Sequence, residues 1–176
     1  MKKTLLPILL FLFCTQMMAQ NDNYDIEMAK KEKKWMAEVE ALATNFKKKI
    51  TDETPFWQTF MLDTFRIERY LSIRMESDYS TQGMNQAMYE AEKRYDKLLN
   101  KYYKMLLDKL QGEDKKVLTE TQKSWILFKE KEYKLMGTVY SVTYTGGGTM
   151  YSNILAGRKL EITKQRAIEL AVYLSE

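Results

Sequence analysis

Apolar residues recur at steps of three and four along most of this chain, which is the spacing of one face of an α-helix. Charged residues, mainly lysine and glutamate, fill the positions between them, as on the solvent side of an amphipathic helix. This alternation predicts five helical segments, over residues 24–50, 55–76, 84–110, 113–137 and 150–174.

Few residues interrupt these segments, because the chain has only seven glycines and two prolines. Thr54 before Pro55 is typical of a helix start, with a capping residue followed by proline in the first turn. Gly112 stands just past the third segment, where glycine commonly ends a helix. Short links between long helices make neighbours antiparallel, so we expect an all-α antiparallel bundle of four to five helices.

The segment 138–145 breaks the helical pattern with valine, threonine and tyrosine, which favour a β-strand. No second strand is present to pair with it, and a single strand is not stable alone. We therefore expect the fourth helix to continue briefly into this segment and then to give way to an irregular loop.

Two apolar stripes carry expectations about the core. The stripe of the third segment is rich in methionine and tyrosine, a composition that also suits a ligand groove, but we interpret it as core packing. In the fourth segment we expect Trp125 to be a buried anchor between helices. The two stripes consist of Met84, Met88, Ala91, Tyr95, Leu98, Tyr102 and Met105, and of Leu118, Thr121, Trp125, Phe128 and Leu135.

The N-terminus has the three parts of a cleavable export signal over residues 1–19. Lys2 and Lys3 supply the positive end, residues 5–13 are apolar, and cleavage after Ala19 would leave Gln20 first. The apolar run is too short to span a bilayer; a buried N-terminal helix is the alternative. We expect no lipid anchor at Cys14, because bulky residues precede it. The mature protein would then be periplasmic or secreted.

Charge and residue types exclude several functions. The chain has 28 Lys+Arg against 24 Asp+Glu, an excess too small to indicate a nucleic-acid partner. It has no histidine, and its single cysteine, Cys14, lies in the signal. Histidine-based catalysis, thiol catalysis and the usual zinc sites are therefore excluded. Carboxylate chemistry alone is left, so we expect neither an enzyme nor a cofactor or metal site.

The glycine-rich stretch 146–149 is neither a P-loop nor a dinucleotide fingerprint, because it lacks the Lys-Ser/Thr ending and the strand–helix context. It is interpreted either as a loose connection between helices or as an adaptable loop for protein recognition. The candidate partner-binding residues in the second interpretation are Tyr144, Gly146, Gly147, Gly148, Thr149 and Tyr151.

Short polar motifs follow one another through the second half of the chain. They are Met84-Asn85; Asp96-x-x-Leu99-Asn100-x-x-Tyr103; Gln122-Lys123-Ser124-Trp125 with Glu132 after it; Gly146-Gly147-Gly148-Thr149; and Thr163-x-x-Arg166-x-x-x-Leu170. With these motifs, the segment from Gln82 to about Leu174 resembles the N-terminal domain of the bacterial family named for the lysozyme inhibitor LprI. Typical members carry cysteines at positions that hold Ala87, Tyr133 and Arg158 here.

The resemblance implies an exported helical protein whose partner is a protein, with a lysozyme-like enzyme as the named example. It divides the chain into a signal (1–19), a helical extension packed on the bundle (20–81) and the family domain (82–176). A structural or stress-related envelope protein without inhibitory activity is the alternative. The shared polar residues form either a ligand site or an interhelix network, with Asp96 and Arg166 in one buried group. They are Asn85, Asp96, Asn100, Tyr103, Gln122, Trp125, Glu132, Thr163 and Arg166.

Overall fold

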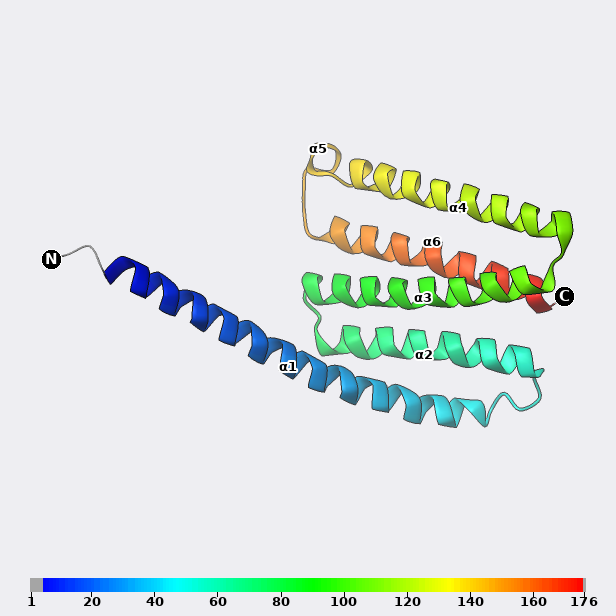
Figure 1. Cartoon of the computed structure of the whole chain (residues 1–176), viewed down its shortest axis with the longest axis horizontal. Helices are drawn as coiled ribbons and strands as arrows, with labels where there is room; N and C mark the ends of the chain where they lie inside the picture. Colours follow the sequence, from blue (N-terminus) through cyan, green and yellow to red (C-terminus); the bar gives the residue numbers. More distant parts are fainter. Residues whose placement is uncertain (1–4, 176) are drawn as a thin grey trace. The chain divides into compact units, whose positions relative to one another are not determined.

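A computed structural model describes the backbone from Leu5 to Ser175 and the side chains from Ile26 to Ser175. Within the described part every regular element is a helix, so the expected all-α class is confirmed (Figure 1). The export signal and Cys14 were placed at residues 1–19, outside the part whose side chains are described. The helices are α1 (Leu5–Lys47), α2 (Pro55–Ser77), α3 (Thr81–Lys109), α4 (Gly112–Val139), α5 (Val142–Thr145) and α6 (Met150–Ser175).

The chain divides into two compact units between Ala41 and Leu42, inside α1. The described part of the first unit is α1 before Leu42. Lys30 Nζ there lies 2.8 Å from Glu27 Oε1, one turn away. The second unit contains the end of α1 and all the other helices, and it is the unit described from here on. The sequence division at Gln82 stays a prediction.

Helix starts follow the expected capping chemistry. Thr54 accepts a hydrogen bond from the backbone N–H of Trp57 at 3.4 Å, and Pro55 opens α2. Ser80 caps α3 in the same way, through the N–H of Gly83 at 3.0 Å. Each cap satisfies a backbone donor that the first helical turn leaves unpaired.

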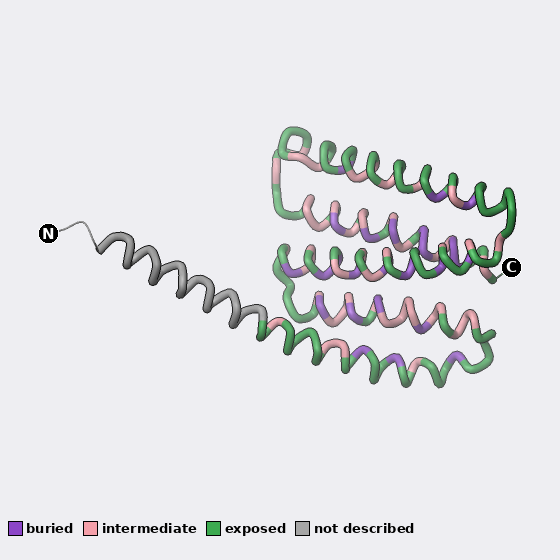
Figure 2. Tube along the Cα trace, in the orientation of Figure 1, coloured by how far each residue is buried: buried purple, intermediate pink, exposed green. Residues whose placement is uncertain are grey.

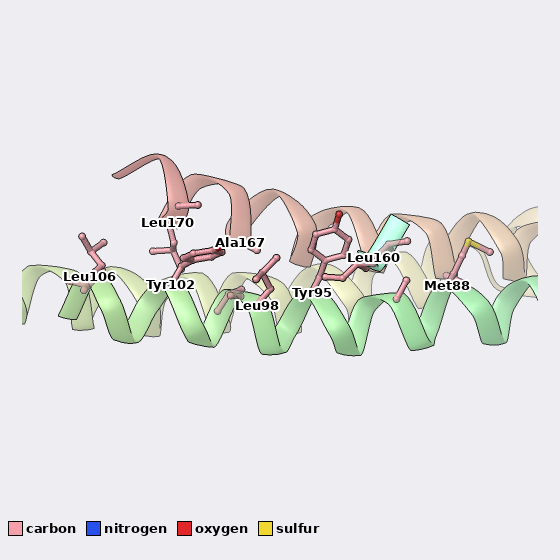
Figure 3. Packing of buried hydrophobic residues seen from close by; sticks show 14 residues of the cluster. Met88, Tyr95, Leu98, Tyr102, Leu106, Leu160, Ala167 and Leu170 are labelled. Carbon is pink, nitrogen blue, oxygen red and sulfur yellow. The ribbon is translucent and has the colours of Figure 1, made fainter. Parts of the chain in front are cut away.

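Helices α3 and α6 form the central pair of the bundle, with α2 beside α3 (Figure 1). The face of α3 carries large residues, including Tyr95, Leu98 and Tyr102, whereas the face of α6 carries Ala156, Ala167 and Ala171. Figure 3 shows Leu98 and Tyr102 pointing towards Ala167 and Leu170. Large residues on one helix opposite small ones on its neighbour allow close packing without voids. The methionine- and tyrosine-rich stripe of α3 is therefore mostly core, as expected, although Met105 is exposed.

A second, smaller cluster joins the last turns of α1 to α2. Ala43, Ile50 and Leu62 are buried there, and the rings of Phe46 and Phe65 stack with centroids 4.2 Å apart. The sequence pattern of residues 42–50 therefore packs against α2, as an amphipathic helix requires.

Helix α4 packs against α6 and is the least buried long helix of this unit (Figure 2). Leu118, Gln122 and Met136 are its buried residues. Three expectations about its inner stripe are wrong, because Thr121 is exposed and Phe128 and Leu135 are 53% and 56% exposed. Trp125 is half-buried and packs against the main core instead of lying wholly inside it. The inner side of α4 is thus narrow and partly polar.

Helix α4 ends at Val139, and the short helix α5 then leads to Gly146. The strand-favouring segment is accordingly helix and turn, as the lack of a pairing strand predicts. Gly146, Gly147 and Gly148 all have positive φ, at 72°, 92° and 119°. These angles are accessible to glycine at little cost and explain why three glycines stand together.

Candidate functional site

The polar residues shared with the motifs separate into several groups. Gln122 and Arg166 are both buried, and Arg166 Nε donates to Gln122 Oε1 at 3.1 Å. Arg166 Nη1 also donates to Glu169 at 3.1 Å, while its Nη2 has no partner among the described residues. This group connects α4 to α6, and its burial favours a structural role.

Asp96 belongs to a different group on the surface of α3. Its carboxylate accepts from Asn100 Nδ2 at 3.1 Å and lies 3.5 Å from Lys129 Nζ of α4. Arg166 donates to Gln122 and Glu169 instead, so the expectation that Asp96 and Arg166 belong to one buried network is wrong. The partners of Asp96 and Arg166 depend on which helices lie side by side, and the order of the motifs along the chain does not reveal them.

The remaining shared residues are spread over the bundle. Asn85 Nδ2 donates to Ser152 Oγ at 2.9 Å and ties the start of α3 to the start of α6. Tyr103 OH reaches Thr119 Oγ1 at 3.5 Å. Glu132 is half-buried on α4. Among the described residues these contacts lie at separate places on the bundle, so the shared residues do not come together in one group.

Thr163 takes part in a three-helix junction centred on Tyr133, which sequence reasoning missed. Tyr133 OH lies 2.7 Å from Glu92 Oε1 of α3, 3.1 Å from Thr163 Oγ1 and 3.0 Å from the Lys159 carbonyl of α6. Burial raises the pKa of the Tyr133 hydroxyl, the hydrogen bond with Thr163 opposes this, and the Glu92 carboxylate raises the pKa further. Tyr133 stands where the family resemblance implies a cysteine, so a polar junction holds α4 in place at that position.

Tyrosine hydroxyls on carboxylates recur between α2 and α3. Tyr70 OH donates to Glu90 at 2.8 Å, and buried Arg74 donates to the same carboxylate at 3.0 Å. Burial raises the pKa of Glu90, but the hydrogen bonds from Arg74 and Tyr70 outweigh it and leave the pKa below its usual value. The abundance of tyrosine was the only sequence signal for these pairs.

Helix α4 carries more exposed large apolar residues than any other helix in the described part of the chain. We use "outer face of α4" for Val117, Phe128, Leu135 and Val139, which are between 47% and 62% exposed and lie on one side of the helix, within about 40° of one another at 3.6 residues per turn. Ile126 and Leu127 are exposed on other sides of α4. Single exposed apolar residues are ordinary on a protein surface, whereas several on one side of a helix are typical of an interaction site.

The glycine loop follows one end of α4 through the short helix α5. Tyr144 and Val142 are 71% and 72% exposed on α5, and Met150 is 62% exposed at the start of α6. Tyr151 lies differently, because its ring stacks on Tyr140 with centroids 6.1 Å apart. Tyr144 is therefore presented to solvent, while Tyr151 is partly buried and supports the loop.

A groove of about 650 Å³ lies between α3 and α4. Its lining is mainly charged, and comprises Tyr89, Glu92, Lys93, Asp96, Lys97 and Lys129. No group of three or more His, Cys, Asp or Glu side chains that could hold a metal occurs among the described residues. Among the helices of the described part, none is long and apolar enough to cross a membrane.

Comparison with known proteins gives one match. None of the curated proteins and none of the solved structures compared is significantly similar to this chain. The model of the family described as lysozyme inhibitor LprI matches residues 73–170, from the end of α2 to near the end of α6. That match spans more than half of the 176 residues, and the chain belongs to the LprI lysozyme inhibitor family.

Proposed function

We propose that this protein is an exported, non-enzymatic binding domain that inhibits a lysozyme-like glycan hydrolase through the outer face of α4 and the adjoining glycine loop. Membership of the inhibitor family supplies the class of partner. The observation that carries the proposal is the row of large apolar side chains that α4 turns to solvent. A partner that covered them would remove that apolar surface from water.

The chemistry of this surface suits protein recognition. Phe128 and Tyr144 are aromatic residues with few rotatable bonds, so little conformational entropy is lost when they are fixed at an interface. Such residues frequently carry most of the binding energy between proteins. The positive-φ glycines let the backbone of the loop approach a partner closely.

Electrostatic attraction contributes little in this proposal. The whole chain has 28 basic and 24 acidic side chains, and Lys2 and Lys3 are lost if the predicted signal is removed. Exposed charges are screened by salt, whereas apolar contact is not. We therefore expect inhibition with weak dependence on salt concentration.

The test is inhibition of a muramidase that degrades peptidoglycan, measured with chain lacking residues 1–19. Wild type should inhibit, and F128A/L135A and Y144A should each inhibit at least about tenfold less well, because hot-spot truncations cost on the order of 2 kcal/mol. The matched control for Y144A is Y79A, since Tyr79 is 74% exposed in the turn between α2 and α3.

Three results would contradict the proposal. Absence of inhibition by wild type would remove the inhibitor function and leave the structural envelope alternative. Equal loss in Y79A would show that any exposed tyrosine matters. Release of fragments by the protein alone, without added muramidase, would show an enzyme.

A further inference from the structure

The groove between α3 and α4 has features that protein binding on the outer face of α4 does not use. It holds about 650 Å³, a volume typical of small-molecule sites. Helices α3 and α4 meet here through long polar side chains, with Tyr133 reaching Glu92 and Lys129 reaching Asp96. Because these contacts bridge a gap, the two helices leave a hollow open to solvent.

The lysines of the groove form an unbalanced cluster. Lys93 and Lys97 are one turn apart on α3, and neither forms an ion pair with any described residue. Like charges at this spacing repel one another and slightly destabilise a helix. Lys129 of α4 also lines the groove, but it faces Asp96 at 3.5 Å, which leaves Lys93 and Lys97 as the lysines of the lining without an ion pair among the described residues. An anionic group bound between them would relieve the repulsion.

The two carboxylates of the groove are already engaged by the protein. Glu92 Oε1 accepts from Tyr133, and Asp96 accepts from Asn100 and faces Lys129. These hydrogen bonds leave both carboxylates charged, so the three lysines and two carboxylates of the lining leave one net positive charge. Each carboxylate still has lone pairs that can accept a hydrogen bond from a ligand hydroxyl.

The combination of donors, acceptors and one aromatic ring selects the class of ligand. Hydroxyl groups both donate and accept, so a hydroxyl-rich ligand is satisfied by ammonium and carboxylate groups together. Tyr89, 37% exposed, offers an apolar ring for the C–H face of a sugar. An acidic peptide also carries carboxylates, but a run of acidic residues has no ring C–H face to lie on Tyr89.

We propose that this groove binds an acidic saccharide, with the sugar ring on Tyr89 and its carboxylate between Lys93 and Lys97. The site is separate from the outer face of α4. Its test therefore needs no hydrolase and does not depend on the inhibitor proposal.

The experiment is calorimetric titration of the chain lacking residues 1–19 with tri-galacturonate, and with uncharged chitotriose as the neutral arm. Wild type should bind the acidic sugar at least about tenfold more tightly than the neutral one. K93Q/K97Q should lose at least about tenfold in affinity for tri-galacturonate, and Y89A should weaken both sugars. K48Q/K49Q is the matched control, with the same change in charge at exposed lysines between α1 and α2.

Competition measurements identify the source of the bound saccharide, and variants test the specificity of the groove. Peptidoglycan fragments with free carboxylates that compete with tri-galacturonate would identify a cell-wall ligand, and failure to compete would identify a free acidic polysaccharide. Either result keeps the site. Three results would each overturn the proposal: equal affinity of wild type and K93Q/K97Q, an equal loss of affinity in K48Q/K49Q, or tighter binding of a poly-glutamate peptide than of tri-galacturonate. Melting temperatures confirm that every variant is folded.

Discussion

At the scale of single residues, the buried Arg166 side chain depends on two hydrogen bonds, to Gln122 and Glu169. Arg166 is 6% exposed, and Gln122, also buried, is the acceptor for its Nε atom at 3.1 Å. A buried charge that loses its acceptor cannot recover the bond from water, so the cost exceeds that of a surface hydrogen bond.

Replacement of Gln122 by leucine should therefore lower the free energy of unfolding by about 1–3 kcal/mol, since leucine fills the volume but accepts no hydrogen bond. Urea denaturation followed by circular dichroism measures this. Q82L is the control, because Gln82 is exposed in the first turn of α3. An unchanged midpoint in Q122L would mean that another group accepts from Arg166.

A second stability measurement concerns Asp96 and Arg166, which the motifs placed in one buried network. Asp96 and Arg166 bind different partners, so D96N and R166M should be additive to within about 0.5 kcal/mol in a double-mutant cycle. A large coupling energy would restore the single network that the motifs suggested.

At the scale of elements, α4 differs from α3 in how much of its apolar surface is used for folding. Trp125 packs against the main core, whereas Phe128, one turn later, is 53% exposed. The two aromatic residues should therefore separate stability from partner binding.

Trp125→Ala should lower the free energy of unfolding by about 1.5–3 kcal/mol, less than the loss for a fully buried tryptophan. Phe128→Ala should change it by less than about 0.5 kcal/mol, as is usual for surface positions. Chemical denaturation of both variants provides the measurement. A loss in F128A as large as that in W125A would place Phe128 in the core and remove it from the proposed binding surface.

At the scale of the whole molecule, buried and half-buried tyrosines bonded to carboxylates connect α2, α3 and α4. Tyr95 OH bonds to Glu68, Tyr102 OH to Asp63 at 3.2 Å, and Tyr133 OH to Glu92 at 2.7 Å. In all three, burial comes first in raising the pKa of the hydroxyl, and the neighbouring carboxylate adds to it. Each pair holds only while the tyrosine is neutral.

This arrangement predicts a loss of stability in alkali. The folded pKa values lie above the ordinary value of 10.0, so the unfolded chain loses these protons first. The tyrosine contribution is complete below pH 10 and decreases as the pH rises towards the folded pKa values.

Thermal unfolding between pH 8 and pH 11 is the measurement, with Y95F/Y133F as the comparison. The double variant should be less stable than wild type at pH 8, where it lacks the two hydrogen bonds, and its melting temperature should fall less steeply above about pH 10. Parallel curves for the two proteins would show that these hydroxyls do not govern the alkaline transition.

The sequence by itself determined the helical class and most helix limits, because apolar spacing, Thr54-Pro55 and the glycine cluster act locally. It also determined that the stripe of α3 is core, and the motif order indicated the family. Local pattern could not decide which side of α4 faces inwards, since Phe128 and Leu118 both belong to an apolar face. That depends on which helix lies alongside.

Only the tertiary structure decided the polar partners. Arg166 bonds to Gln122, Tyr133 bonds to Glu92, and Asp96 faces Lys129, each across a gap of 30 residues or more in sequence. Such pairs require two helices to be placed at a particular rotation and offset, and no local propensity encodes that placement. The groove between α3 and α4 follows from the same placement, because long side chains and not close backbone packing bring the two helices together there.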